Sequence, residues 1–238
     1  MLKKICFFCV FALNLWAFDF NPIKASVDEV SESAVFIKDN PQIQVGASAI
    51  IVKQIKNASS IISRASVVGR ERGLIKLDLK PFTMLTQRAL PELDVKVQAG
   101  DEVIVNFLYD RLLLIAPDEA SYKAVEQSLP ELYFMHPDIL SAYMVREYKL
   151  SPKREDFSLV CSNNALGIVA FVLEGKVAFV DCADFTLLFE KPLNAQVAKP
   201  QLPFYSNIKS YKKNFFNFAE KRVADYYDYY TQIIRQAK

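Results

Sequence analysis

The pattern of apolar residues changes near Pro117, and this change constrains the fold more than any other feature of the chain. Before it, short β-branched runs alternate with turn signals over residues 18–117, which is typical of a small β-barrel or sandwich. After it, apolar residues recur at helical spacing, and residues 117–146 are predicted to form a short αβα insertion. The sequence therefore predicts a mixed α+β protein.

Two hairpins are predicted inside the β-rich part. Residues 61–68 and 74–79 flank the charged turn 69–73, and apolar residues alternate with Lys76 and Asp78 in the second strand. Residues 102–108 and 111–116 are predicted to pair in the same way across Tyr109 and Asp110.

The insertion has its own start and stop signals. Asp118 is a good N-cap for a helix that ends before Pro130. A short apolar strand at residues 132–134 follows, and Pro137 is expected at the first position of a second helix. We therefore assign residues 18–147 to one β-rich domain with an αβα insertion, and place a boundary within residues 148–156.

The rest of the chain divides into three parts. Residues 157–191 are predicted to form an antiparallel β-meander, with strands at 157–161, 168–173, 177–182 and 185–189. Residues 192–205 read as a proline-containing linker. Residues 206–238 are predicted to form a long, basic, tyrosine-rich helix.

This C-terminal helix carries more aromatic residues than one buried face needs. We weigh two interpretations: the helix docks on the body of the protein, or it presents a face to envelope proteins or a membrane surface. Residues that recur on one face are Phe216, Ala219, Val223, Tyr227, Tyr230 and Ile234.

Residues 1–17 resemble a secretory signal peptide. Lys3 and Lys4 precede an apolar run that is too short to span a bilayer, and Ala17 offers a small residue for cleavage before Phe18. We expect an exported protein, in the periplasm or at the outer-membrane surface.

The two cysteines outside the leader fit an oxidising compartment. Cys161 and Cys182 form an even pair, and a disulfide between them is the default expectation there. In a flat meander they would lie on strands separated by a third, about 9.6 Å apart, which exceeds the reach of a disulfide. Two buried free thiols therefore remain the alternative.

Charge argues against nucleic acid as a partner. Without Lys3 and Lys4 the chain has 27 basic residues (29 − 2) and 27 acidic ones, whereas nucleic-acid binding favours a basic surplus. The chain from Ser206 onward is nevertheless basic, with seven basic residues against three acids: Lys209, Lys212, Lys213, Lys221, Arg222, Arg235 and Lys238 against Glu220, Asp225 and Asp228. This surplus either attracts the acidic body or contacts an external partner.

The residue types that catalysis, metal binding or cofactor binding usually require are sparse. The single histidine, His136, fits a helix cap or the surface better than a catalytic or zinc site. Six glycines leave no glycine-rich phosphate loop, and no nucleophile elbow occurs. We expect a non-catalytic protein without metal or cofactor.

Several short strings stand out together along the chain: FDFNPI at 18–23, LIAPDE at 114–119, HPDIL at 136–140, DYYD at 225–228 and the segment from Cys161 to Cys182. Taken together, they resemble the N-terminal domain of bacterial plasminogen-binding proteins of the PgbA/PgbB type. The resemblance implies an exported surface protein that captures host plasminogen. Plasminogen kringles hold a lysine that presents an ammonium and a carboxylate together, so the resemblance implies Lys238 as the main contact, with Lys209, Lys212 and Lys213 as accessory charge.

Two hypotheses follow for function. The chain is a host-protein binding module, or it is a periplasmic envelope scaffold or assembly protein with no host ligand.

Overall fold

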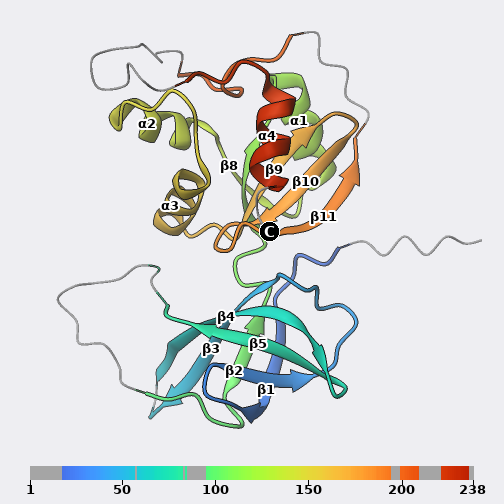
Figure 1. Cartoon of the computed structure of the whole chain (residues 1–238), viewed down its shortest axis with the longest axis vertical. Coiled ribbons are helices and arrows are strands. Elements are labelled where there is room, and N and C mark those ends of the chain that lie inside the picture. The colour runs from blue at the N-terminus through green and yellow to red at the C-terminus, as the bar shows by residue number, and fades with distance from the viewer. Residues whose placement is uncertain are drawn as a thin grey trace, which may run out of the picture.

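The computed structural model describes residues 18–56, 58–82, 84, 95–193, 199–208 and 221–235. These residues form two lobes, a β-barrel and a layer of helices around a second sheet (Figure 1). The mixed α+β class that the sequence predicts is confirmed.

The barrel is closed by antiparallel pairing throughout, in the order β1-β2-β5-β4-β3-β6 and back to β1. Alternate residues such as Ile37, Ile51 and Leu77 point inward and are fully buried. The strands are β1 (Ile23–Val30), β2 (Ala34–Lys38), β3 (Ser48–Ile55), β4 (Ala58–Glu71), β5 (Leu74–Lys80) and β6 (Glu102–Val105).

The predicted hairpin after residue 61 corresponds to β4 and β5, with a tighter turn than expected. Arg72 and Gly73 alone connect the strands, with φ angles of 52° and 76°. Two successive positive φ angles are what a type I′ hairpin turn requires.

The second sheet has the order β11-β10-β9-β7-β8, and strand β7, next to the edge strand β8, runs parallel to both β8 and β9. Strand β10 is antiparallel to both of its neighbours, β9 and β11. The strands are β7 (Arg111–Ile115), β8 (Tyr133–Met135), β9 (Ile168–Leu173), β10 (Lys176–Asp181) and β11 (Leu187–Pro192).

The predicted pairing of residues 102–108 with residues 111–116 is wrong. Residues 112–115 are fully buried on both faces of the strand, which suits the centre of a parallel sheet covered by helices rather than a barrel wall. Asn106 and Leu108, with φ angles of 60° and 61°, turn the chain out of the barrel and into the second sheet.

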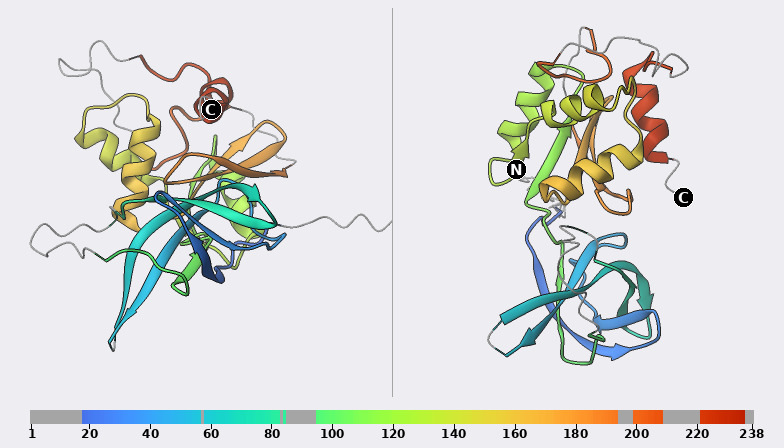
Figure 2. Two further views of the ribbon diagram at one scale, coloured as in Figure 1. Left: turned by 60° about the horizontal axis from the view of Figure 1, so that its bottom comes forward. Right: turned by 90° about the vertical axis from the view of Figure 1, so that its left-hand side faces the viewer.

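Helices cover both faces of this second sheet (Figure 2). Helix α1 (Glu119–Ser128) packs Tyr122 and Val125 on the face that Leu112 and Leu114 present. The opposite face, with Leu113 and Ile115, is covered by α2 (Asp138–Arg146), α3 (Arg154–Asn164) and α4 (Tyr226–Arg235). As predicted, Asp118 caps α1, because its Oδ1 accepts a hydrogen bond of 2.7 Å from the Ser121 amide.

Residues 157–161 are helical and not a strand, which corrects the start of the predicted meander. Phe157, Val160 and Cys161 are buried at helical spacing. Asp156 fixes the start of α3 because its Oδ2 accepts from the Lys153 amide at 2.8 Å. Residues 111–147, assigned above to the first domain, thus share one sheet and its helices with residues 154–192.

The C-terminal helix is shorter than predicted. Residues 206–208 and 221–225 are not helical, and residues 209–220 and 236–238 lie outside the described residues. Asp225 sets the beginning of α4 by accepting a hydrogen bond of 2.8 Å from the Asp228 amide. At the other end, Arg154 donates to the carbonyl oxygens of Ile233 and Ile234.

The described part of this helix docks on the body. Tyr226 and Tyr230 are buried, and their hydroxyls donate to the carbonyl oxygens of Ile115 and Pro203 at 2.9 and 3.0 Å. These tyrosines form part of the second core, so they are not presented to a membrane or a partner.

Candidate functional site

The lysines expected to contact plasminogen, Lys209, Lys212, Lys213 and Lys238, lie outside the described residues. The candidate site is the junction between the two lobes, where a disulfide and several buried polar side chains lie close together.

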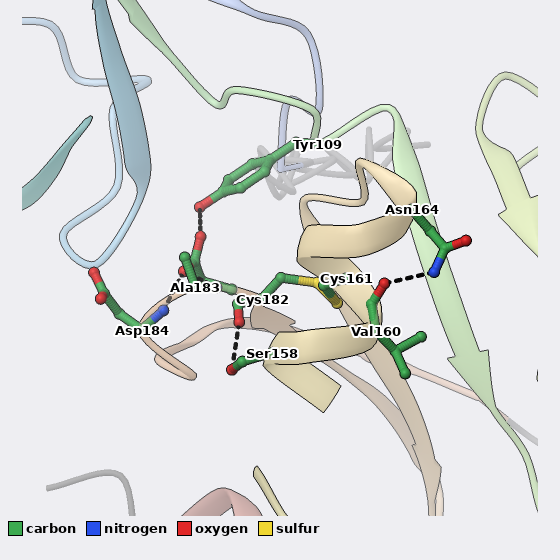
Figure 3. The surroundings of a disulfide bond; sticks show 9 residues. Tyr109, Ser158, Val160, Cys161, Asn164, Cys182, Ala183 and Asp184 are labelled. Atoms are coloured by element: carbon green, nitrogen blue, oxygen red, sulfur yellow. Dashed lines mark hydrogen bonds between the residues drawn. A yellow bond between two sulfur atoms is a disulfide. The ribbon is translucent and has the colours of Figure 1, made fainter. Parts of the chain in front are cut away.

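The disulfide between Cys161 and Cys182 lies at this junction (Figure 3). Cys161 is in α3 and Cys182 directly follows β10, so their Cα atoms lie 6.0 Å apart, within the normal range for a disulfide. Because Cys161 lies in a helix and not in a strand, no third strand separates the two cysteines, and the spacing expected for a flat meander does not apply. Ser158 supports the same contact by donating a hydrogen bond of 2.9 Å to the Cys182 carbonyl oxygen.

Tyr109 links the lobes through a buried hydrogen-bond chain. Its hydroxyl accepts from the Ser48 amide of β3 and donates to Asp181 Oδ2 of β10, each at 2.8 Å. The Asp181 Oδ1 atom accepts from the amides of Ala183 and Asp184 at 2.9 and 2.8 Å. Burial, with the carboxylate of Asp181 beside it, holds the pKa of Tyr109 well above its ordinary value, so the hydroxyl keeps its proton and remains a donor.

Asp184 joins the second lobe to the barrel wall. Its carboxylate pairs with Arg64 Nη2 and with Lys80 Nζ, each at 2.8 Å, and it accepts a hydrogen bond from the Ser66 hydroxyl. Burial alone would raise the pKa of Asp184, but the hydrogen bonds from Lys80, Ser66 and Arg64 together hold it below the ordinary 3.8. The carboxylate is therefore charged at neutral pH and clamps two strands of the barrel.

A cavity of about 160 Å³ lies beside this junction. The disulfide, Arg64 and Asp181 line it together with apolar side chains such as Ile50 and Phe107. The charged groups that line it are already engaged: Asp181 accepts from Tyr109 and from two amides, and Arg64 is paired with Asp184. These contacts fasten the two lobes to each other.

His136 and Asp156 both have structural partners. The His136 Nδ1 atom accepts from the Asp138 amide at 3.2 Å, and its ring contacts Tyr122 and Tyr205. Asp156 caps α3 and accepts from Tyr143 at 2.9 Å. Within the described ranges, no group of three or more histidine, cysteine, aspartate or glutamate side chains could hold a metal ion.

Sequence reasoning missed the residues that join the lobes. The sequence pattern predicts Tyr109 in a hairpin turn and marks neither Asp181 nor Asp184 as a site residue. The sequence contains one signal: an aspartate within an apolar strand, in Val180-Asp181-Cys182, is costly to bury unless it is paired. Its partners lie far away in the sequence, so their identity could not be read from it.

Together, the fold and the junction define a two-lobed α+β protein whose buried polar centre is structural. A family model described as "Plasminogen-binding protein pgbA N-terminal" matches residues 22–234, so the chain belongs to this family. The match covers both lobes and nearly all the described residues. The family is named for binding and not for catalysis.

Two relatives, each named "Plasminogen-binding protein PgbA", come from two strains of Helicobacter pylori. They are 21% and 20% identical over 221 residues, which cover 91% of this chain and 48% of each relative. The chain thus spans about half the length of these relatives.

One solved structure is a weak match, the crystal structure of the cytochrome b5 reductase domain of Ulva prolifera nitrate reductase. It has a TM-score of 0.22 and 14% identity, and covers 49% of this chain and 72% of that one. A likeness at this TM-score carries no argument about fold or activity. In the part of the chain that the structure describes, no helix is long and apolar enough to cross a membrane.

Proposed function

We propose that this chain is an exported, non-catalytic binding protein that captures host plasminogen through lysine side chains. Membership of the family across residues 22–234 carries the proposal, together with the name of the two relatives. We place the protein in the periplasm or at the outer-membrane surface, where the leader-like residues 1–17 would direct it.

The basic segment near the C-terminus is the proposed contact. Lys238 would present its ammonium group to a kringle pocket that holds lysine side chains. In the sequence, Lys238 follows Arg235, the last residue of α4, by three positions. Lys209, Lys212 and Lys213 would supply accessory positive charge.

Many lysines of the described body are less suited to this role because acids neutralise them. Lys24, Lys123 and Lys176 form ion pairs of 2.9, 2.6 and 2.8 Å with Glu102, Glu119 and Glu190. A kringle would have to displace the acid before it could bind the ammonium, which favours the tail lysines as ligands.

Surface plasmon resonance on immobilised plasminogen tests the proposal with purified residues 18–238. We expect saturable binding that a free lysine analogue competes away, and that the variant Lys238→Gln loses. The double variant Lys24→Gln/Lys123→Gln serves as a matched control, because it removes lysines of the body that are already paired, and it should bind as the wild type does.

Binding that ignores both the lysine analogue and Lys238→Gln would contradict the terminal contact. Binding that Lys238→Gln retains, and that the lysine analogue still competes away, would move the contact to Lys209, Lys212 and Lys213. Absence of binding would favour the alternative, a periplasmic envelope scaffold. Protease treatment of intact cells separates these locations, because a periplasmic protein stays protected.

A further inference from the structure

The carboxyl ends of the parallel strands β7 and β9 form the place where sheets of this kind hold ligands. From β7 the chain passes through α1 to β8 on one side, and later returns to β9 on the other side of β7. Such a switch in strand order opens a crevice beyond the carboxyl ends of the two strands. Here Asp118 follows β7 and Glu174 follows β9, so acidic side chains stand at this edge.

A groove of about 600 Å³ leads from this edge, between α4 and the outer strands β10 and β11. Glu174, Asp225 and Tyr227 line its upper end, while Leu187 and Arg235 line the rest. Figure 1 shows α4 crossing the sheet beside these two strands, with the outer side of β11 facing away from the other strands.

The charge of the groove favours a cationic ligand. Glu174, Asp225 and Asp228 make no ion pair with any described residue, whereas Glu190 is paired with Lys176 at 2.8 Å. Burial and the carboxylates of Asp118, Glu174 and Asp225 raise the pKa of Tyr227, which reports a negative potential at this end. A phosphate or carboxylate ligand would be repelled there, and a lysine side chain attracted.

Strand β11 supplies a second means of binding. It ends the order of the sheet, and no other described strand pairs with its outer edge. An open edge presents unpaired backbone groups to which an extended peptide can add as a further strand. Alternate side chains of that peptide would lie on the α4 side of the sheet, near exposed Leu187 and the acids of the groove.

We propose that this groove and the edge of β11 bind an extended, lysine-bearing segment of a partner protein by strand addition. The peptide backbone pairs with β11, and its lysine ammonium groups reach Glu174, Asp225 and Asp228. Arg235, at the far end of α4, accommodates an acidic residue of the same segment. In the proposed plasminogen contact the lysines belong to this chain, whereas here they belong to the partner. The failure of one interaction in its test therefore does not decide the other.

The test uses residues 18–238 and a short, blocked peptide that alternates lysine with threonine, with binding followed by calorimetry. The triple variant Glu174→Gln/Asp225→Asn/Asp228→Asn removes the charges but keeps the hydrogen-bonding shape, including the Asx cap of α4. We expect it to bind about tenfold more weakly, from three exposed charge contacts. The control Asp28→Asn/Glu32→Gln/Glu131→Gln changes net charge equally at exposed acids away from the groove, and should bind as the wild type does.

Two further probes separate strand addition from simple charge attraction. The same peptide with every backbone amide N-methylated has no N–H left to donate to a strand edge on either side, and we expect it not to bind. A glutamate–threonine peptide should also fail. Hydrogen exchange at the β11 amides should slow only with the unmodified peptide. No saturable binding, equal binding by both triple variants, or equal binding of the methylated peptide would overturn the proposal.

Discussion

Replacement of Asp184 by alanine should loosen the junction between the lobes. This carboxylate is the anion that Arg64 and Lys80 share, each at 2.8 Å. In the alanine variant, Arg64 and Lys80 lose this carboxylate as their partner, and the Ser66 hydroxyl loses its hydrogen-bond acceptor. We therefore expect a clear loss of stability although Asp184 lies in a loop.

The size of the loss follows from burial. Removal of one partner from a fully buried pair costs about 3–5 kcal/mol, whereas an exposed pair contributes about 0–1 kcal/mol. The side chains of Arg64 and Asp184 are each 20% exposed, so the pair lies between these limits. We expect a decrease of about 2 kcal/mol in the free energy of unfolding, or about 4–8 °C in Tm for a chain of this size.

Urea denaturation at about pH 7, with Asp39→Ala as control, measures this difference. Asp39 pairs with Arg70 at 2.9 Å, almost the same length, but the two side chains are 46% and 38% exposed. The control should lose about 0.5 kcal/mol or less. An Asp184→Ala variant no less stable than Asp39→Ala would refute the argument from burial.

The pH dependence gives an independent check. The pKa of Asp184 is lower in the folded protein than its ordinary 3.8, so its contribution is fully present above that value and is lost as the pH falls through the folded pKa. The stability difference between the wild type and Asp184→Asn should therefore be constant near neutral pH and shrink below about pH 3.8. A difference that persists unchanged in stronger acid would mean that charge is not its source.

Three other predictions concern stability and are measured by urea or thermal denaturation. Replacement of both Cys161 and Cys182 by serine should lower the unfolding free energy by about 3 kcal/mol, because the bridge closes a separation of 21 residues; an unchanged midpoint would show that the bridge does not form. Gly167→Ala should destabilise the protein by about 1–3 kcal/mol, because a Cβ there would meet the Leu108 carbonyl and lie 2.8 Å from the Phe107 oxygen. The control Gly69→Ala should be nearly neutral, because the space around Gly69 is open. Tyr230→Phe should cost about 1 kcal/mol from the lost bond to Pro203, and Tyr230→Ala about 3–5 kcal/mol; two variants of equal stability would place this side chain outside the core.

Local signals in the sequence account for much of the fold. The β4–β5 hairpin, the Asp118 cap and strands β9 and β10 are found from alternation, capping residues and turns, because these depend on neighbours in the chain. The pairing of β7 is decided by residues far away, and its short apolar run is compatible with either sheet. Phe157 to Cys161 is equally ambiguous in so short a window, and only the cap at Asp156 separates helix from strand.

The candidate site was predictable to a smaller degree. The number of cysteines predicts the Cys161–Cys182 pairing. The geometry that permits this pairing depends on α3, which the sequence pattern predicts as a strand. Tyr109, Asp181 and Asp184 function through partners 61 to 118 residues away, and one sequence contains no information that marks such pairs. The tail lysines stay a prediction because they lie outside the described residues.

The separation of Asp184 from its partners also sets an order of assembly. A chain made from its N-terminus has all six described barrel strands once Val105 is available. Asp184, however, comes 118 residues after Ser66 and 104 after Lys80. If the barrel closes early, the cations of Arg64 and Lys80 therefore face water until most of the second lobe, including Asp184, has been made. The junction can therefore be completed only after residue 184 has been made, and until then the basic wall of the barrel is open to any acidic surface that the growing chain meets.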